Sequence, residues 1–319
     1  MQKAFFSFSK RAEKSDSDVL VDTFVDCEPL LDIIEAPNSQ VIYGRRGTGK
    51  THALKFVQEK KSDEAITVFI DLRSIGSNGS TYTDVSFPVS ERATRLIIDV
   101  LQTIADDLYY YAVEQIDVAQ HPEQITSRID DLIECISAVK IDGSVVERTL
   151  FSSEGGSDWK IALDAKLSPS PELNASAAAG GSDTASAVRE RRLEGNEKLH
   201  LEFGKIQAAI ASVKGVLGDP EVWIFIDEWS EVPLDIQPYL ADLFRKTILP
   251  LNQVFIKIAA IEHRSRFSVY TSDSEYIGME LGADISAYVS LDDFLVFDND
   301  SEKATEFFSG LYLIIVFQS

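Results

Sequence analysis

The chain has 319 residues, of which 45% are hydrophobic, and its 30 Lys and Arg against 52 Asp and Glu leave a formal net charge of −22. This length and apolar content exclude a disordered chain and predict one large α/β domain, or one domain plus part of a second. The negative charge argues against a broad surface for DNA or RNA, because such surfaces depend on many Lys and Arg contacts with phosphates.

The cysteines and histidines show no spacing typical of a metal or redox site. Cys27 and Cys135 lie far apart without a CxxC pair, which is typical of free thiols in a reducing compartment. The four histidines are scattered, which argues against a structural zinc site. The charged N-terminal segment does not fit a signal peptide, and the apolar run 311–317 is far shorter than the roughly 20 residues that cross a bilayer. We therefore expect a cytoplasmic protein without a membrane span.

In chain order, residues 40–43 predict a short strand that enters a glycine-rich loop, and a helix is predicted to follow from Lys50. Residues 65–72 are apolar and β-branched, as expected for a strand covered on both faces. Two amphipathic helices are predicted next, one after the N-cap candidate Ser90 and one from Pro122. Their expected core residues recur at three- and four-residue steps: Ala93, Leu96, Ile97, Val100, Leu101, Ile104 and Leu108, then Ile125, Ile129, Leu132 and Ile136.

Residues 141–195 have a different pattern and predict an insertion in the core fold. Residues 157–168 alternate strictly between apolar and polar side chains, which is the two-residue period of a half-exposed strand. With residues 144–151 before them, they predict a protruding β-hairpin. The Ser-, Ala- and Gly-rich residues 168–187 predict a mobile linker.

The remaining segments alternate between helix and strand. Helices are predicted at 196–218, 233–249 and 301–317, and strands at 222–227, 253–262 and 286–291. This alternation predicts an α/β fold with a mostly parallel, five-stranded sheet and helices on both faces.

The glycine-rich loop matches the spacing G-x-x-x-x-G-K-[ST] without departure, through Gly44, Arg45, Arg46, Gly47, Thr48, Gly49, Lys50 and Thr51. Glycines let the backbone curve with its N–H groups toward one centre, and the next helix adds its positive N-terminal end. Lys50 is then expected to reach the β- and γ-phosphates of ATP, and the Thr51 hydroxyl to take one Mg²⁺ position. A chance glycine turn is disfavoured, because strand, loop and helix come in the order that the motif requires.

A buried strand that ends in two acids predicts the second half of the site. In VWIFIDEW the apolar run carries Asp227 to the strand end, where its carboxylate can hold Mg²⁺ through water. Glu228 stands where a base can polarise an attacking water, with a solvated or salt-bridged acid as the alternative. Together with the loop, this strand end predicts hydrolysis of ATP rather than binding alone.

These motifs resemble those of the AAA+ ATPases: a Walker A loop, a strand and helices, a Walker B strand ending in Asp-Glu, a helix and a further strand. Within them the chain is most similar to the origin-recognition and initiator-like branch and the neighbouring STAND-type ATPases. The resemblance is good over residues 44–71 and 196–293 and loose over 27–44. It implies a three-layer P-loop NTPase sandwich in which another strand separates the Walker B strand from the P-loop strand.

The resemblance also implies a sensor residue after the strand that follows Walker B, usually a small polar side chain near the γ-phosphate. Here Glu262 and His263 occupy that place and are candidates by position alone. Arg264 and Arg266 are candidates for fingers that reach the nucleotide of a neighbouring subunit, with ordinary surface arginines as the alternative.

Five further residues near these motifs have two interpretations. Asp71 and Arg73 end the second strand on the expected nucleotide side and are candidates for coupling the acidic strand end to a partner. Trp229 is more typical of core or interface packing than of stacking on adenine. Gln237 and Tyr239 could face a partner, although packing is favoured.

After the sheet, the resemblance implies a helical lid with a nucleotide-sensing arginine. The ATPase domain is predicted over residues 1–300, with 141–195 inserted, which leaves 301–319 for one helix with no basic residue after Lys303. We therefore expect a lid that is vestigial or cut short, and no room for the winged-helix DNA-binding module of initiator relatives.

The leading interpretation is a Mg²⁺-dependent ATPase that switches or remodels a macromolecular partner in a DNA-linked, mobile-element or defence process. The net charge favours a protein partner or self-association over direct binding of a free duplex. The alternative is a nucleotide-gated interaction protein with little or no turnover. A small-molecule P-loop kinase is disfavoured, because kinases usually carry an Arg-rich lid over the phosphates.

Overall fold

The computed structural model describes residues 24–25, 29–75, 82, 84–115, 122–137, 139–151, 187–199, 201–270 and 275–295, and the single residues 305 and 309. The chain divides into two compact units. The larger unit comprises Met1–Ser137 and Leu201–Ser319, and the smaller one comprises Ala138–His200.

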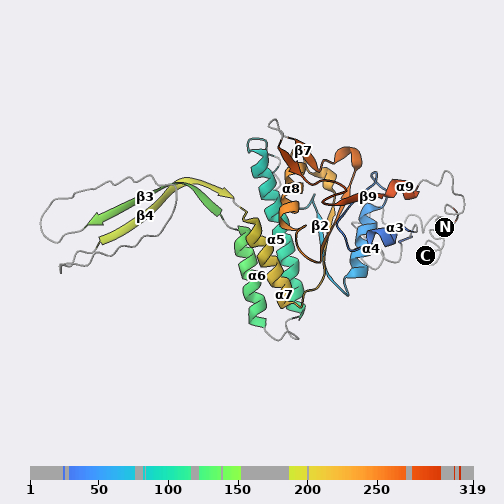
Figure 1. Ribbon diagram of the computed structural model, residues 1–319, viewed down its shortest axis with the longest axis horizontal. Coiled ribbons are helices and arrows are strands. Elements are labelled where there is room, and N and C mark those ends of the chain that lie inside the picture. Colours follow the sequence, from blue (N-terminus) through green and yellow to red (C-terminus); the bar gives the residue numbers. More distant parts are fainter. Residues whose placement is uncertain are drawn as a thin grey trace, which may run out of the picture. The chain divides into compact units, whose positions relative to one another are not determined.

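Five parallel strands form the central sheet of the larger unit (Figure 1). Their spatial order is β2 (Ile66–Asp71), β5 (Val222–Asp227), β6 (Val254–Ala260), β1 (Gln40–Tyr43) and β9 (Ser286–Ser290). β6 separates the strand before the glycine-rich loop from the strand that ends in Asp-Glu. The predicted α/β fold of the P-loop NTPase type is confirmed, including the strand order that the resemblance implied.

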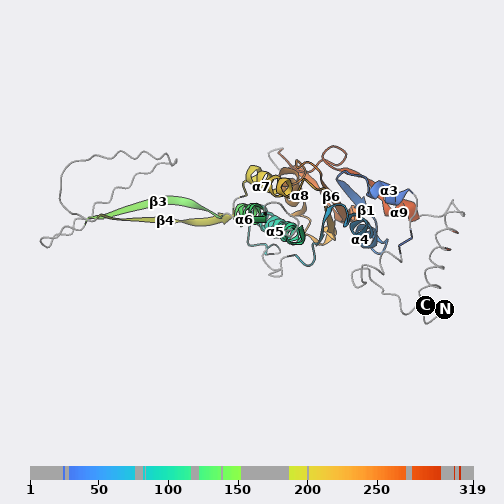
Figure 2. The same cartoon turned by 90° about the horizontal axis from the view of Figure 1, so that it is seen from below.

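Helices cover both faces of this sheet, which explains why its central strands β5 and β6 are mostly apolar. Every residue of β5 is buried. α4 (Lys50–Lys61) packs against β2, β5 and β6, while α5 (Val89–Gln115) packs against β2 and α8 (Gln237–Thr247). Figure 2 shows α4 and α5 on opposite sides of the sheet. The result is a three-layer arrangement of helix, sheet and helix.

The two predicted amphipathic helices are confirmed. α5 begins at Val89, one residue before the expected N-cap, and α6 spans Pro122–Ser137. All of the core residues predicted for these two helices are buried. α6 packs against both α5 and α7 (Phe203–Val216), so the apolar faces of three helices meet.

The smaller unit contains one antiparallel hairpin, formed by β3 (Val139–Phe151) and β4 (Ala187–Leu199). Residues 144–151, predicted as one strand of a hairpin, belong to β3 and pair with β4. Residues 157–168 and most of the predicted linker lie outside the described residues. Residues 196–199 were expected to be helical and instead belong to β4, since pairing with a distant strand can override a local helical pattern.

Several short elements complete the larger unit. α3 (Leu30–Ile34) precedes β1, and α9 (Leu291–Leu295) follows β9. The 3₁₀ turns η2 (Trp229–Glu231) and η3 (Glu262–Arg264) follow β5 and β6. A small antiparallel pair of strands, β7 (Ser268–Tyr270) and β8 (Tyr276–Gly278), was not predicted and packs against α8. Of the helix predicted over 301–317, residues 305 and 309 are described, and both are helical.

The sheet contains a fully buried lysine on β6. The ammonium group of Lys257 donates a hydrogen bond to the carbonyl oxygen of Ala36 at 2.7 Å and lies 5.1 Å from the ring centroid of Trp223. Burial lowers the pKa of Lys257 to about 7, with the charge of Lys61 as a second cause. The lysine thus attaches the segment before β1 to the neighbouring strand, at the cost of desolvating a cation.

We expect Lys257 to make the free energy of unfolding rise with pH. Its folded pKa of about 7 lies below the ordinary value of 10.5, so the unfolded chain binds more protons between these pH values. Lys257→Met removes this contribution, so the stability of the parent relative to the variant should increase by on the order of 1 kcal/mol per pH unit across the window. Urea unfolding of both proteins at several pH values measures the difference. Parallel pH curves for the two proteins would contradict the assignment.

Candidate nucleotide site

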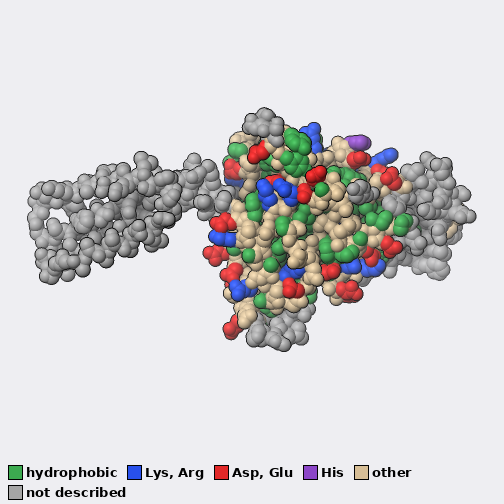
Figure 3. All heavy atoms as spheres, in the orientation of Figure 1, with side chains coloured by type: hydrophobic (Ala, Val, Ile, Leu, Met, Phe, Trp, Pro, Cys, Tyr) green, Lys and Arg blue, Asp and Glu red, His purple; other side chains and the backbone are tan. Residues whose placement is uncertain are grey.

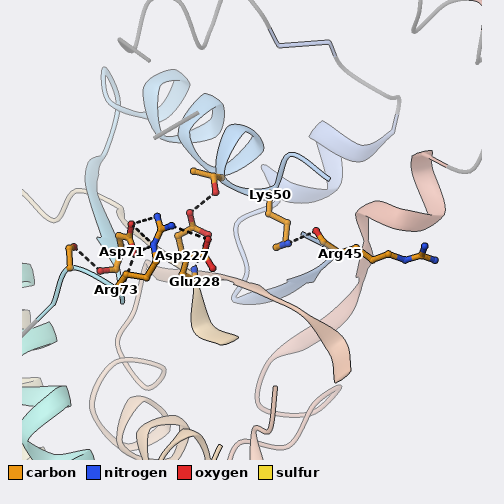
Figure 4. Close-up of polar contacts among 8 residues, drawn as sticks. Arg45, Lys50, Asp71, Arg73, Asp227 and Glu228 are labelled. Atoms are coloured by element: carbon orange, nitrogen blue, oxygen red, sulfur yellow. Dashed lines mark hydrogen bonds and ion pairs between the residues drawn. The ribbon is translucent and has the colours of Figure 1, made fainter. Parts of the chain in front are cut away.

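The predicted motifs meet at the carboxyl edge of the sheet, where parallel strands all end (Figure 4). Tyr43 at the end of β1 pairs with Ala260 at the end of β6, and Asp71 at the end of β2 pairs with Asp227 at the end of β5. This edge is where open α/β sheets bind their ligands. The glycine-rich loop, the acidic pair and the end of β2 therefore surround one place.

The loop has the backbone conformation that its glycines permit. Gly47 and Gly49 have φ values of 87° and 86°, in the left-handed region that side chains disfavour. Gly44 is required for space, because a Cβ added there would lie 2.5 Å from Thr48 Oγ1. The Thr48 hydroxyl donates a hydrogen bond to the carbonyl oxygen of Arg45 at 2.9 Å, which closes the turn. The loop then enters α4 at Lys50.

Lys50 lies across the loop and not in solvent. Its ammonium group donates hydrogen bonds to the carbonyl oxygens of Gly44 and Arg45, each at 2.8 Å. Burial lowers the pKa of Lys50, and the charges of Asp227 and Glu228 partly oppose that shift. The result is a localised positive charge at the start of a helix, held among acids and backbone carbonyls.

Asp227 joins the loop to the end of β5. Its side chain is buried, and Thr51 Oγ1 donates a hydrogen bond to Asp227 Oδ2 at 2.7 Å. The backbone N–H of Glu228 donates to Asp227 Oδ1 at 2.9 Å. Burial raises the pKa of Asp227, and these two hydrogen bonds oppose the shift. Two hard oxygen donors, one from a hydroxyl and one from a carboxylate, thus lie side by side.

Glu228 occupies a strained turn next to an arginine. Its φ of 58° and ψ of 38° place it in the left-handed region, which is uncommon for a residue other than glycine. Burial raises the pKa of Glu228, and the adjacent charge of Asp227 raises it further. Arg73 Nη1 lies 3.5 Å from Glu228 Oε1, and Arg73 Nη2 lies 2.6 Å from Asp71 Oδ2. The structure therefore brings Asp71 and Arg73 to the acidic strand end, as expected for residues that couple to it.

Arg45 lies at the other side of the loop together with Asp292, an acid that the motifs did not include. The Arg45 side chain is 84% exposed and points away from the acidic pair (Figure 4), and Arg46 is also exposed. The backbone N–H of Arg45 donates to Asp292 Oδ2 at 3.1 Å, and its Nε lies 3.7 Å from the same oxygen. Asp292 is the second residue of α9, which follows β9 directly. Asp292 was not singled out in the sequence analysis, although an acid directly after the predicted strand 286–291 was a signal that could have found it.

The sensor and finger candidates lie just after β6. Glu262, His263, Arg264 and Arg266 are all exposed. Tyr43 has a pKa raised to about 12, first by burial and then by the charge of Glu262, which places that acid near the end of β1. The geometry gathers these residues at the correct edge of the sheet without assigning a role to any of them.

The packing interpretation of Trp229 and Gln237 is confirmed. Trp229 is fully buried and stacks on Phe267 with ring centroids 5.0 Å apart. Gln237 is also fully buried, and Tyr239 is half-buried on the same helix.

Sheet order, loop and acidic strand end together define the class of protein as one with a P-loop NTPase core. Residues 6–61, which include the whole loop, match the family model described as ORC-CDC6-like. This N-terminal part of the chain is thus similar to the ORC-CDC6-like family, an AAA+ initiator-like family. Members of this family are generally ATPases, which implies nucleotide binding. Searches of curated proteins and of solved structures each found no match.

In the described part of the chain, no group of three or more His, Cys, Asp or Glu side chains is placed to hold a metal ion by itself. No described helix is long and apolar enough to cross a membrane.

We expect the loop glycines to be needed for conformation. Gly49→Ala places a side chain at φ 86° and should lower the free energy of unfolding by about 1–2 kcal/mol. Gly215→Ala is the matched control, because Gly215 is an exposed helical residue of α7 whose added Cβ would meet no atom within 4 Å. That control should raise stability by about 0.5–1 kcal/mol. Denaturant midpoints compare the two variants, and equal effects would contradict the strain assigned to the loop.

Proposed function

We propose that the protein binds ATP with Mg²⁺ and hydrolyses it to switch or remodel a macromolecular partner. The observation that carries this proposal is the 2.7 Å hydrogen bond between Thr51 and Asp227, which joins the end of the glycine-rich loop to the end of the acidic strand. The family match supports the same reading, because ORC-CDC6-like proteins are generally ATPases.

The loop and Lys50 are suited to hold the phosphates. Loop amides and the N-terminal end of α4 favour an anion, and the ammonium group of Lys50 is half-buried among them. In this role Lys50 exchanges its contacts with the Gly44 and Arg45 carbonyls for phosphate oxygens. Such an exchange replaces neutral acceptors by charged ones, which form stronger hydrogen bonds.

Thr51 and Asp227 fit Mg²⁺ in the chemistry of their donors. Mg²⁺ prefers oxygen ligands and is usually held by one or two protein groups together with water and substrate phosphates. The hydroxyl of Thr51 and the carboxylate of Asp227 already adjoin, and Asp227 has a backbone N–H to orient it. When bound, the metal would neutralise charge on the phosphates.

Glu228 is suited to be the general base. It adjoins Asp227 in sequence, and burial raises its pKa, so its carboxylate is a stronger base than an exposed glutamate. A carboxylate in this place can orient a water molecule and accept its proton as the water attacks the γ-phosphate.

The ion pair between Arg73 and Glu228 favours a second candidate function, a nucleotide-gated interaction protein with low basal turnover. While its carboxylate is paired with an arginine, a glutamate cannot orient the attacking water, and it becomes able to do so when the ion pair opens. A protein partner or a second copy of the chain is the proposed trigger. On the face shown in Figure 3, acidic and basic side chains of the described residues are interspersed, which suits a protein surface better than nucleic acid.

We expect Glu228→Gln to separate binding from turnover. Steady-state release of phosphate should fall at least about 100-fold, because the amide cannot accept the proton, while ATP affinity measured by calorimetry stays within about twofold. Glu231→Gln, at an exposed acid in the same turn, is the control and should keep the parental rate. Unchanged hydrolysis in Glu228→Gln would reject the base, and no Mg²⁺-dependent release by the parent would favour the passive switch.

Arg73→Ala tests whether the ion pair restrains Glu228. The pair is partly exposed and therefore of modest strength, so basal turnover should rise about two- to fivefold when it is removed. Arg128→Ala breaks an exposed ion pair with Asp131 on α6 and should leave turnover unchanged. A lower rate in Arg73→Ala would mean instead that Arg73 holds Glu228 in its working position.

A further inference from the structure

Two loops at the carboxyl edge of the sheet are connected through one buried side chain. The first, the Glu228 turn (residues 228–232), follows β5, and the second, the charged loop (residues 261–267), follows β6. Gln237, the first residue of α8, lies between them and is 0% exposed.

The amide of Gln237 hydrogen-bonds to the backbone of both loops. Toward the Glu228 turn, its Nε2 donates to the carbonyl oxygen of Val232 at 2.8 Å and approaches that of Trp229 at 3.4 Å. Toward the charged loop, Nε2 donates to the carbonyl oxygen of Arg264 at 3.2 Å, and Oε1 accepts from the N–H of Arg266 at 2.7 Å. All four partners are backbone groups, so the side chain fixes chain positions.

Additional contacts hold the same two loops together. Ser230 Oγ accepts a hydrogen bond from the N–H of Ile261 at 2.9 Å and lies 3.2 Å from Ser265 Oγ. The Trp229 ring stacks on Phe267 with planes 10° apart. The loops are thus joined by hydrogen bonds from side chains to backbone groups and by aromatic packing.

This connection bears on Glu228 because the conformation of that residue is unfavourable by itself. A non-glycine residue at φ 58° persists only where its surroundings over-determine it. Inside the turn, the N–H of Glu231 donates to the Glu228 carbonyl at 3.0 Å. Gln237 binds Val232 and approaches Trp229, two residues of this turn that follow Glu228, and so holds the path of the chain as it leaves Glu228.

We propose that Gln237 is a positioning residue that sets the place of Glu228 and couples it to the charged loop. The loop presents the exposed side chains of Glu262, His263, Arg264 and Arg266, so a partner that contacts them shifts Glu228 through Gln237. This inference rests on the proposed function, in which Glu228 orients the attacking water.

Only a side chain with both a donor and an acceptor can make these contacts. Gln237→Met keeps the length of the side chain but leaves the Val232 and Arg264 carbonyls and the Arg266 N–H without their partner. Gln237→Glu, when ionised, keeps an acceptor for the Arg266 N–H but faces two carbonyl oxygens without a donor. In both variants the Glu228 turn should lose its attachment to the charged loop and become more mobile.

The test compares Gln237→Met with Gln207→Met, the same substitution at a partly exposed residue of α7 that loses one side-chain hydrogen bond. Gln237→Met should lower kcat for ATP about ten- to hundredfold while KM and ATP affinity change less than about threefold. Hydrogen exchange should quicken at residues 229–232 and 261–266 together. Gln207→Met should match the parent in all these measurements.

The outcomes separate this inference from the proposed function. If the parent hydrolyses ATP and Gln237→Met keeps the parental kcat, the inference is overturned. If the parent binds ATP without releasing phosphate, the proposed hydrolysis fails, and hydrogen exchange is then the test of the coupling. If Gln237→Met quickens exchange in only one of the two loops, or in neither, the coupling is overturned. If Gln237→Met does not fold, Ser230→Ala removes a second link between the same loops and must lower kcat at least severalfold for the inference to stand.

Discussion

The site depends on the hydrogen-bond donors that stabilise one buried carboxylate, that of Asp227. Asp227 is 1% exposed, and a carboxylate in that setting is stable only with hydrogen-bond donors close by. Thr51 and the backbone of Glu228 supply them, and Thr51 is 176 positions away in the chain. This one requirement binds the end of the glycine-rich loop to the end of β5, and so sets the distance between the loop, for which we propose phosphate binding, and the acids that face it.

The parallel sheet makes that meeting possible and also concentrates charge. Because β1, β2, β5 and β6 all end at one edge, Asp71, Asp227 and Glu228 lie near one another, with Lys50 and Arg73 as nearby cations. Burial raises the pKa of both Asp227 and Glu228; the charge of Asp71 adds to the shift of Asp227, and the charge of Asp227 adds to that of Glu228. An edge of this kind is suited to a ligand that brings positive metal charge and negative phosphates together.

Around this charged edge, neutral polar contacts keep the backbone in place. Gln237 and Ser230 hold the loops after β5 and β6 by hydrogen bonds to main-chain groups, and the stacked Trp229 and Phe267 exclude water from them. Such buried amides and hydroxyls are stabilising only when fully paired, so they favour a single arrangement of the loops. The strained φ of Glu228 is maintained in that arrangement.

The sequence alone determined the five strands of the central sheet, the buried faces of α5 and α6, the glycine-rich loop and the acid at the end of β5, because these are local patterns of spacing and hydrophobicity. Only the tertiary structure decided which distant segments meet. β4 pairs with β3 across more than 30 intervening residues, Asp292 reaches the loop from the far end of the chain, and Arg73 reaches Glu228. The role of Gln237 as a link between loops was likewise hidden. Such contacts join residues far apart in the chain, and their energies depend on burial and geometry that no short window of sequence records.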